Sequence, residues 1–374
     1  MKFVLAPDSF KNALRSPEVC AALADGIRMA QPEAEILAIP LADGGEGTVR
    51  AAALAAEGVL EQYETSGPLG APLTAETARL PGGVAVVEMA SAAGLELLSP
   101  DGCVPLEATT FGVGLLLRQL LDSGCRDFVI GLGGSATTDG GAGMLQALGA
   151  RFYDDAGRLL PKGIGGGGLS AIRRADLSGL LPELAASRIR IASDVTNPLT
   201  GPQGAAAVFA PQKGASAAEA ELLDAGLRHY AALFGDDGSR PGDGAAGGMG
   251  FALRKLLHGR PESGAELLLE LAGFDRRVAG ADFVITGEGR SDSQSAAGKL
   301  CVTVARRAAR AGVPTILCSG SLGPGSELLE TEFAACFSCS IGPEPLEEAL
   351  AATRERLTRF SRNLTRLLTS NPSR

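Results

Sequence analysis

Residues 128–145 read FVIGLGGSATTDGGAGML. The apolar start, Phe128–Ile130, is typical of a short buried strand, and Met144 and Leu145 begin a helical stripe. Between them, residues 131–141 contain glycines, small hydroxyl residues and one acid, with almost no bulk for a hydrophobic core. Bare backbone lets N–H groups approach an anion without obstruction by side chains. This segment, called the glycine loop below, is therefore interpreted as a phosphate cradle between a strand and a helix.

The alternation of strand and helix recurs along the chain. Further short apolar runs indicate buried strands at residues 3–6, 36–39, 84–87, 189–192, 283–285 and 315–317. A helix is expected to start at Ser16, with the hydroxyl as N-cap and Pro17 in the first turn. A second helical stripe runs from Val113 to Leu121. The pattern predicts an α/β fold with largely parallel sheets.

Length and composition are those of a globular protein. The chain has 374 residues, more than the roughly 250–300 over which one core usually grows, so about two domains are expected. A net charge of −9 disfavours a nucleic-acid partner. No apolar run approaches the roughly 18 residues of a membrane span, and the first residues lack a signal-peptide pattern. We therefore expect a cytoplasmic protein without nucleic-acid or membrane partners.

Acidic residues follow almost every predicted strand. The segments after these strands are Asp8–Ser9, Asp43–Gly47, Glu88, Gly133–Asp139, Asp194–Asn197 and Gly287–Arg290. Each acid alone is equally well explained as a helix cap. Taken together with the glycines, they are expected to meet at the carboxyl ends of parallel strands, where such folds bind ligands. Carboxylate and amide oxygens suit Mg²⁺, and the glycines suit phosphate.

Two alternatives remain open on the residues alone. Gly131, Gly133 and Ala136 also fit a G-x-G-x-x-[GA] dinucleotide fingerprint, with Asp154 and Asp155 about twenty residues later. The first alternative is therefore an NAD(P)-dependent oxidoreductase that uses the glycine loop, although this leaves the other acids without a role. The second is a nucleotide-binding regulator without catalysis. A P-loop is excluded, because no G-x-x-x-x-G-K-[ST] sequence occurs.

Two further glycine-rich stretches occur. Residues 163–168 are expected to form a flexible surface connection. Residues 244–250 are the better candidate for ligand contact, because apolar residues follow them at helical spacing.

Several of these motifs resemble the bacterial glycerate kinases and occur in the order typical of that family. They are APDSFK (6–11), ADGGEGT (42–48), GGSATTDGG (133–141), DVTNPL (194–199), PQKG (211–214) and TGEGR (286–290). Together these motifs span nearly the whole chain and are highly specific.

The resemblance implies ATP- and Mg²⁺-dependent phosphorylation of D-glycerate, with 2-phosphoglycerate favoured over 3-phosphoglycerate. It also implies two α/β domains, of which one is discontinuous and built from both chain ends. The expected boundaries give a domain of residues 1–70 plus 290–374 and an inserted domain of 71–289, with the active site in the cleft between them. The chain is expected to be a monomer or a homodimer.

Roles for individual residues follow from the needs of phosphoryl transfer. Asp194 is predicted to be a base or a metal ligand, and Lys11 and Arg290 to contact anions. Arg290 is expected to grip the glycerate carboxylate and Lys11 to lie near the transferred phosphate, although the reverse is possible. Lys213 and Lys299 are equally consistent with surface cations and with anion contacts.

The remaining predicted site residues fall into two groups. Substrate or nucleotide binding is predicted for Asp8, Ser9, Gly44, Gly45, Gly133, Gly134, Ser135, Thr137, Asn197, Gly287 and Gly289. Mg²⁺ binding is predicted for Asp43, Glu46 and Glu288.

Overall fold

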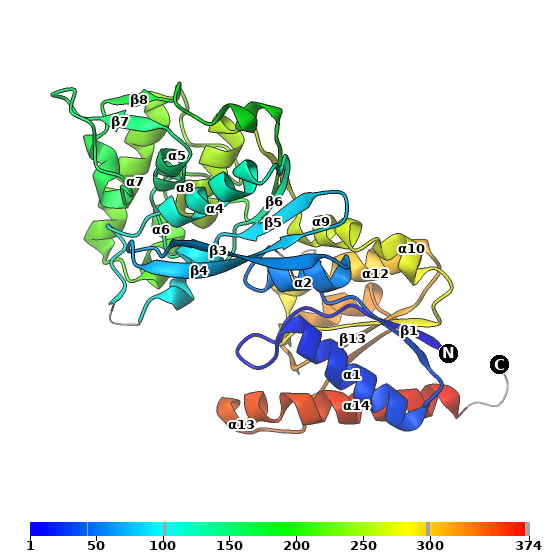
Figure 1. Cartoon of the computed structure of the whole chain (residues 1–374). Coiled ribbons are helices and arrows are strands. Elements are labelled where there is room, and N and C mark those ends of the chain that lie inside the picture. The colour runs from blue at the N-terminus through cyan, green and yellow to red at the C-terminus, as the bar shows by residue number, and fades with distance from the viewer. Residues whose placement is uncertain (43, 100–101, 297–299, 371–374) are drawn as a thin grey trace. The chain divides into compact units, whose positions relative to one another are not determined.

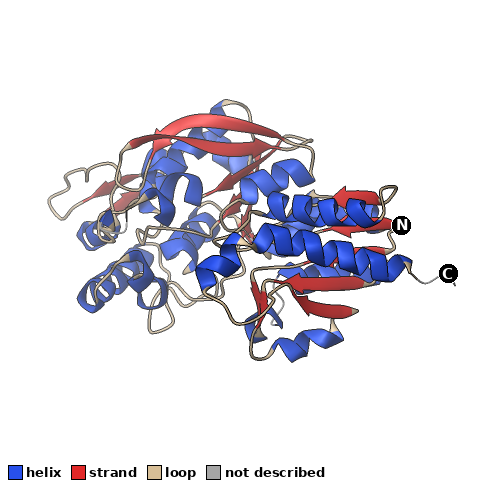
Figure 2. Ribbon diagram, turned by 90° about the horizontal axis from the view of Figure 1, so that it is seen from below, coloured by secondary structure: helices blue, strands red, loops and turns tan. Residues whose placement is uncertain are grey.

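The computed structural model describes residues 1–42, 44–99, 102–296 and 300–370. Among these residues, no helix is both long and apolar enough to cross a membrane. The mixture of strands and helices confirms the predicted α/β class with mostly parallel sheets (Figures 1 and 2).

The chain divides into two compact units. Unit 1 comprises residues 1–43, 51–57 and 265–374, and unit 2 comprises 44–50 and 58–264. The helix α2 (Thr48–Ala55) contributes residues to both. The residue ranges of the two units say which parts of the chain pack together, and they do not define the domain boundaries. The domain boundaries near residues 70 and 290, and a cleft between the domains, stay predictions.

Unit 1 is built on a five-stranded parallel sheet in the order β15-β13-β11-β1-β2. Its strands are β1 (Lys2–Leu5), β2 (Glu35–Ala38), β11 (Phe283–Thr286), β13 (Thr315–Ser319) and β15 (Ala335–Ser338). A parallel pair also joins β12 (Arg290–Ser291) and β14 (Ser321–Leu322). The apolar runs predicted four of the five sheet strands, whereas β15 is partly exposed and has no such run.

The helices of unit 1 cover this sheet. They are α1 (Ser16–Ala30), α9 (Gly264–Leu271), α10 (Phe274–Val278), α11 (Ser293–Ala296), α12 (Leu300–Arg310), α13 (Leu346–Ala351) and α14 (Thr353–Thr369). The first residue of α9 is counted with unit 2. Figures 1 and 2 show α1 and α14 side by side. At their crossing a side chain on Gly26 would overlap Thr358 and Ser361 of α14, so the two helices need glycine there.

Ser16 is not the N-cap that the sequence predicted. Arg15 occupies the cap position, and Ser16 is the first residue of α1. The buried Ser16 hydroxyl donates to the Pro7 carbonyl at 2.7 Å and accepts from the Leu41 amide at 2.8 Å. The hydroxyl thus ties together the segments that follow β1 and β2. A capping pattern cannot reveal a bond to a distant segment.

Unit 2 contains a six-stranded sheet in the order β10-β9-β6-β5-β4-β3. Its strands are β3 (Val59–Ser66), β4 (Pro72–Arg79), β5 (Val84–Glu88), β6 (Asp127–Gly131), β9 (Arg188–Ala192) and β10 (Arg260–Glu262). The last four are parallel, whereas β3 and β4 form an antiparallel hairpin at one edge. The hairpin escaped prediction because its residues are largely polar or exposed. A small antiparallel pair joins β7 (Arg151–Tyr153) and β8 (Arg174–Asp176).

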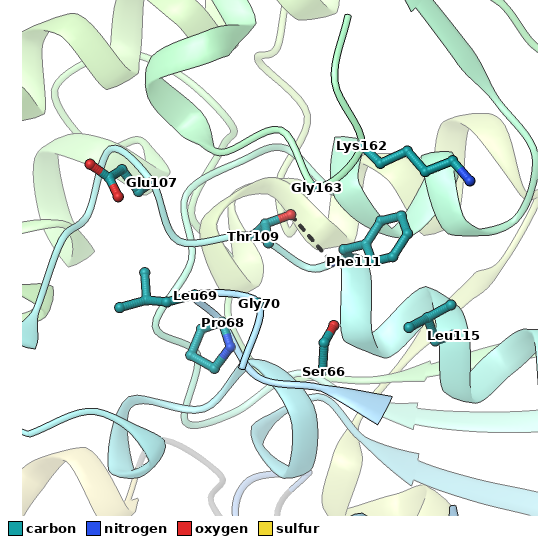
Figure 3. Close-up of a pocket in the computed structure, with 10 residues that line it drawn as sticks. All are labelled: Ser66, Pro68, Leu69, Gly70, Glu107, Thr109, Phe111, Leu115, Lys162 and Gly163. Atoms are coloured by element: carbon teal, nitrogen blue, oxygen red, sulfur yellow. Dashed lines mark hydrogen bonds between the residues drawn. The ribbon is translucent and has the colours of Figure 1, made fainter. Parts of the chain in front are cut away.

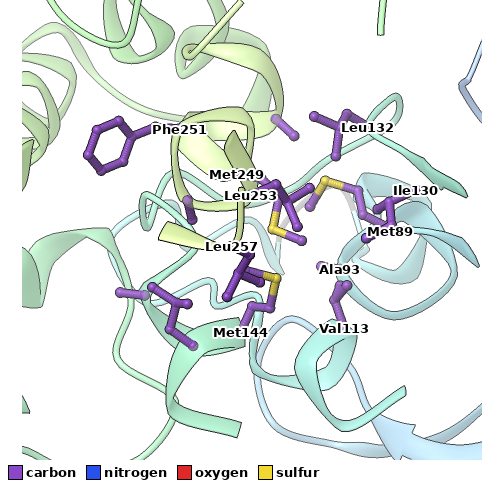
Figure 4. Packing of buried hydrophobic residues seen from close by; sticks show 14 of the residues in the cluster. Met89, Ala93, Val113, Ile130, Leu132, Met144, Met249, Phe251, Leu253 and Leu257 are labelled. Carbon is purple, nitrogen blue, oxygen red and sulfur yellow. The ribbon is translucent and has the colours of Figure 1, made fainter. Parts of the chain in front are cut away.

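The helices of unit 2 enclose one large hydrophobic core. They are α3 (Ala90–Ala93), α4 (Phe111–Asp122), α5 (Ala142–Ala147), α6 (Ala205–Phe209), α7 (Ala217–Leu233) and α8 (Ala245–Phe251). Figure 4 shows Met89, Met144 and Met249 meeting in this core, from the sheet edge, α5 and α8 respectively. The side chains that flank the glycine loop are therefore anchored in packed interior.

Both additional glycine stretches differ from expectation. Residues 163–168 pack tightly, since Gly166 is buried in a short 3₁₀ segment and a side chain there would reach the Thr138 carbonyl. Residues 245–250 are buried, and Ala246, Gly247 and Gly248 all have positive φ. This left-handed turn lies behind the glycine loop, whose Gly140 amide donates to Gly247. Both stretches support other backbone; residues 245–250 are buried throughout, whereas Gly167 in the first stretch is exposed.

Candidate functional site

The carboxyl ends of three parallel strands in unit 2 lie next to one another. Glu88 of β5 pairs with Gly131 of β6, and Gly131 pairs with Ala192 of β9. The segment 44–47 joins them, because the Gly133 amide donates to the Gly44 carbonyl at 3.0 Å. A Cβ on Gly44 would lie 2.6 Å from the Ala192 carbonyl oxygen. Segments far apart in the sequence thus converge at one edge of this sheet.

The glycine loop presents free backbone donors at this edge. Gly134 is exposed and has φ 72°, a left-handed conformation that favours glycine. Among the residues that the structure describes, the amides of Gly134 and Ser135 have no hydrogen-bond partner. Neighbouring bonds fix the loop, since the Gly134 carbonyl accepts from Leu95 and the Ala136 amide donates to Ala93. Two adjacent N–H groups on a fixed backbone are suited to binding an anion.

Gly133 of the glycine loop is required for close packing against the segment 44–47. A side chain on Gly133 would overlap the backbone of Gly45, so both predicted glycines lie in direct contact. Gly45 in turn accepts from the Thr48 hydroxyl at 2.6 Å, at the start of α2. Thr137 is fully buried and its hydroxyl has no partner among the described residues. Its predicted contact with a ligand stays a prediction.

Asp139 fastens the end of the glycine loop. Its buried carboxylate accepts from the Thr110 amide at 2.8 Å and from the Thr110 hydroxyl at 2.7 Å. The amides of Gly141 and Gly143 donate to it at 3.1 and 3.2 Å. Burial raises the pKa of Asp139, and these donors oppose the rise. Asp139 therefore joins the start of α5 to the segment before α4.

Glu88, at the same edge, has a raised pKa. Burial raises the pKa of Glu88 to about 7, and the negative charge of Glu46 adds to the rise. The amides at the start of α2 act in the opposite direction, and that of Val49 donates at 3.2 Å. Glu88 therefore titrates near neutral pH. The sequence placed an acid at this strand end but gave it no role.

The loop after β9 carries two predicted site residues. Asp194 is exposed and Asn197 is half-buried. The Asn197 carbonyl accepts from the amides of Gly242 and Gly244, at 3.1 and 3.0 Å. Asp243, between these glycines, is buried and held by Arg254 through two hydrogen bonds of 2.5 and 2.6 Å. A buried ion pair thus fixes the loop that supports Asn197.

Unit 1 brings together the remaining predicted residues at the ends of β1 and β11. The Asp8 amide donates to the Gly287 carbonyl at 2.8 Å, and the Ser9 amide donates to an Asp8 carboxylate oxygen at 2.6 Å. Gly289 lies against the backbone of Lys11. The two glycines and the acid therefore form one edge in unit 1, as the alternation of strands and acids predicted.

The charged residues of unit 1 lie on this edge. Glu288 accepts from the Ser291 hydroxyl at 2.8 Å. Lys11 is exposed, and Arg290 is exposed with its nearest carboxylate, that of Asp292, at 3.4 Å. Both cations are accessible to a ligand. Their roles stay predictions.

Of two further acids predicted to bind Mg²⁺, the structure describes one and not the other. Glu46 is exposed at the edge of unit 2, whereas Asp43 lies outside the described residues. In the part of the chain that the structure describes, no group of three or more His, Cys, Asp or Glu side chains is arranged to hold a metal. The assignment of Asp43, Glu46 and Glu288 to Mg²⁺ stays a prediction.

A separate pocket of about 370 Å³ lies elsewhere in unit 2. Figure 3 shows it between the β3–β4 turn at Pro68, the side chain of Phe111 and the segment at Gly163. Thr109 lies at its wall and accepts from the Phe111 amide at 3.2 Å. None of the predicted site residues lines this pocket.

Comparison with known proteins gives matches along almost the whole chain. A model of the glycerate kinase family matches residues 3–369. The chain belongs to the glycerate kinase family. A glycerate kinase from Bacillus subtilis (strain 168) is 42% identical over 371 residues, which cover 97% of each chain. A glycerate 2-kinase from Escherichia coli (strain K12) is 43% identical over 371 residues, again 97% of each chain.

A solved structure supports the same relationship for the fold. The crystal structure of a protein from Salmonella typhimurium LT2, assigned as glycerate kinase 2, matches with a TM-score of 0.87 and 43% identity. The match covers 99% of this chain and 98% of that chain. As a member of the glycerate kinase family, the chain is a phosphotransferase whose acceptor is an alcohol group, and it uses a nucleotide substrate.

Family membership confirms the resemblance read from the motifs. It also favours the interpretation of the glycine loop as a phosphate cradle over its interpretation as a dinucleotide fingerprint. In a kinase, the glycine loop and the neighbouring acids can both serve the nucleotide substrate. The oxidoreductase hypothesis leaves these acids without a role.

The sequence does not reveal the roles of three charged groups around the loop, of which Asp139 and Lys213 are buried and Glu88 is half-buried. Asp139 belongs to the quoted stretch, yet the sequence indicates no role for it. Glu88 is visible in the sequence only as an acid after a strand. The sequence does not decide whether Lys213 is a surface cation or an anion contact, and the structure excludes the surface, because the residue is 2% exposed. The only sequence feature that the three residues share is a position close to apolar or glycine-rich sequence. That position does not show whether a side chain is buried.

Proposed function

We propose that the chain transfers the γ-phosphoryl group of ATP, bound as its magnesium complex, to D-glycerate, and that 2-phosphoglycerate is the product. The names of two relatives support the substrate, since one is a glycerate kinase and the other a glycerate 2-kinase. Each is at least 42% identical along 97% of this chain. The second name favours phosphorylation of the 2-hydroxyl.

One structural observation carries the proposal. The adjacent amides of Gly134 and Ser135 lack partners among the described residues, at a strand end where Gly134 is exposed. Phosphoryl transfer asks for positioning and for stabilisation of charge on the phosphate oxygens. Donors that are already fixed in place supply both without reorganisation. We therefore assign the glycine loop to the phosphates of the nucleotide.

Magnesium enters this scheme as part of the substrate. Mg²⁺ bound to nucleotide phosphates keeps several waters and needs only one or two protein carboxylates. Glu46, Glu288 and Asp43 are the acids that we assign to it. Their oxygen donors are of the type that Mg²⁺ prefers.

D-glycerate, as the phosphoryl acceptor, needs a group that receives the proton of its hydroxyl and a cation that binds its carboxylate. We assign Asp194 to receive the proton of the attacking hydroxyl or to ligate the metal, with Asn197 beside it. Arg290 is assigned to the glycerate carboxylate and Lys11 to the transferred phosphate, because a guanidinium binds a carboxylate with two parallel hydrogen bonds. Asp8, Ser9 and the glycines 287 and 289 are assigned to hold these ligands in unit 1.

The experiment measures ADP release with D-glycerate and MgATP, and identifies the product by proton-coupled ³¹P NMR. A phosphate on the 2-hydroxyl couples to one proton and gives a doublet, whereas a phosphate on the 3-hydroxyl couples to two protons. Thermal shift with MgATP, D-glycerate and NAD(P) is run in parallel. A doublet and stabilisation by MgATP are expected.

Two variants test the site, with matched controls on exposed residues of each unit. Asp194→Asn is compared with Asp155→Asn, and Arg290→Ala with Arg359→Ala. Asp194→Asn is expected to lower kcat at least about 100-fold. Arg290→Ala is expected chiefly to raise KM for D-glycerate. Near-wild-type turnover of both variants would refute the residue assignment, and stabilisation by NAD(P) alone would refute the kinase reaction.

A further inference from the structure

Lys213 lies in the interior of unit 2 directly below the glycine loop. It ends a short 3₁₀ segment, Pro211–Lys213, and the left-handed Gly214 then turns the chain away. The ammonium donates to the Ser135 hydroxyl oxygen at 2.8 Å and to the Thr137 carbonyl at 2.6 Å. A lysine is rarely buried to this extent without a specific partner.

The partners of Lys213 are neutral oxygens. Among the described residues, no carboxylate lies within 4.0 Å of its ammonium. Asp139 is the charged group that acts on it, from a greater distance, and its carboxylate is already bonded to Thr110, Gly141 and Gly143. Burial lowers the pKa of Lys213 to about 7, against the opposing effect of Asp139. A bound anion nearby would favour the charged form.

The hydrogen bond to Ser135 has a directional consequence. A serine hydroxyl has one donor hydrogen and two acceptor lone pairs. Because Lys213 occupies an acceptor position, the hydroxyl hydrogen of Ser135 is left to donate to another group. Among the described residues, the backbone amides of Ser135 and of its neighbour Gly134 also have no hydrogen-bond partner. Lys213 thus acts on the part of the loop where two backbone amides and one hydroxyl, from two adjacent residues, can all donate hydrogen bonds.

We propose that Lys213 is a positioning residue for nucleotide phosphate binding: it orients the Ser135 hydroxyl as a donor and places a positive charge beneath the phosphate. This inference rests on the proposed kinase function. Lys213 acts through Ser135 and the loop backbone, and it does not itself contact the substrate.

The main test replaces the ammonium with an apolar chain of similar length, Lys213→Met. Lys162→Met removes an exposed lysine of the same unit and is the matched control. Urea unfolding shows whether each variant is folded, and Lys213→Met is expected to be as stable as the wild type or more stable, because a buried charge is removed. Lys213→Arg keeps the charge and is expected to restore part of the activity.

The kinetic readout separates positioning from a purely structural role. Lys213→Met is expected to lower kcat/KM for MgATP at least about 100-fold, with KM for D-glycerate unchanged. The dependence of MgATP affinity on pH between 6 and 9 is expected to be weaker in this variant than in the wild type, because Lys213 no longer contributes and Glu88, at the same edge, still titrates in this range. Ser135→Ala is expected to lose less activity, and the double variant to be no worse than Lys213→Met, since both changes act on one interaction.

Each outcome decides the inference. A folded Lys213→Met with wild-type kcat/KM and pH dependence overturns it and leaves the glycerate kinase function intact. If Lys213→Met does not fold, an unchanged Ser135→Ala overturns it. If the wild type does not phosphorylate glycerate, the affinity for MgATP measured by calorimetry replaces turnover. A loss of that affinity in Lys213→Met supports the inference although the proposed function has failed, and an unchanged affinity overturns it.

Discussion

Replacing Glu88 with glutamine should change how the stability of the protein depends on pH. In the folded chain, burial and the charge of Glu46 raise the pKa of Glu88 from 4.5 to about 7. The folded state therefore binds more protons than the unfolded state between these values. Its free energy of unfolding must fall as pH rises through that window. The stabilising contribution of the protonated carboxyl is complete below pH 4.5 and is lost above about pH 7.

The magnitude follows from the same values. Each tenfold change in proton affinity is worth about 1.4 kcal/mol, so a rise from 4.5 to about 7 corresponds to roughly 3 kcal/mol. Glu88 is partly exposed to solvent, and screening by water lowers this free-energy difference. We therefore expect about 1–3 kcal/mol. Glutamine retains an oxygen that can accept from the Val49 amide but cannot ionise.

Urea unfolding at pH 5 and pH 8 tests the prediction. The difference in the free energy of unfolding, Glu88→Gln minus wild type, should be larger at pH 8 than at pH 5 by about 1–3 kcal/mol, because only the wild type loses stability as the pH rises. Glu221→Gln, on the exposed side of α7, is the control and should show no such change. Parallel pH dependences of the wild type and Glu88→Gln would refute the assignment of Glu88 as a group that titrates near neutrality.

Four further substitutions test the packing. Gly133→Ala places a Cβ against Gly45, so kcat/KM for MgATP should fall about 100-fold with little change in the circular dichroism spectrum, and wild-type kinetics would refute the contact. Asp243→Asn removes one charge of a buried ion pair and should cost roughly 3 kcal/mol in urea unfolding, an expectation that a loss below about 1 kcal/mol would contradict. Arg254→Met in the same background should recover part of that loss. Gly26→Ala inserts a methyl between α1 and α14 and should lower stability by about 1–3 kcal/mol, whereas an unchanged melting temperature would show that the helices can separate.

The strands of the parallel sheets could be predicted because their cause is local. Buried parallel strands are apolar on both faces, so β1, β6 and β13 appear as short runs of Val, Ile, Leu and Phe. The glycine loop was equally visible, since bare backbone is written directly in the sequence. The hairpin of β3 and β4 was not, because edge strands with exposed faces carry no such run.

The support of the site could not be predicted, because it depends on contacts between distant segments. Nothing local to Lys213 indicates that its ammonium reaches Ser135, 78 positions earlier. The same holds for the positive φ angles of Ala246, Gly247 and Gly248, a turn in which Gly247 packs against Thr137 and Thr138. Composition identified residue types suited to phosphate, but it could not separate the residues that bind from those that hold the binding residues in place.

The strand order of unit 1 has a consequence for how this protein is made. Phe3 of β1 pairs with Phe283 of β11, so the first strand to leave the ribosome meets its second neighbour only after most of the chain has been synthesised. Until then β1 has β2 as its partner on one side, while its other edge stays open to solvent. Nascent chains with such an edge are prone to association, and they gain most from chaperones during this interval. Slower translation through unit 2 should lengthen the exposure and lower the yield of folded protein.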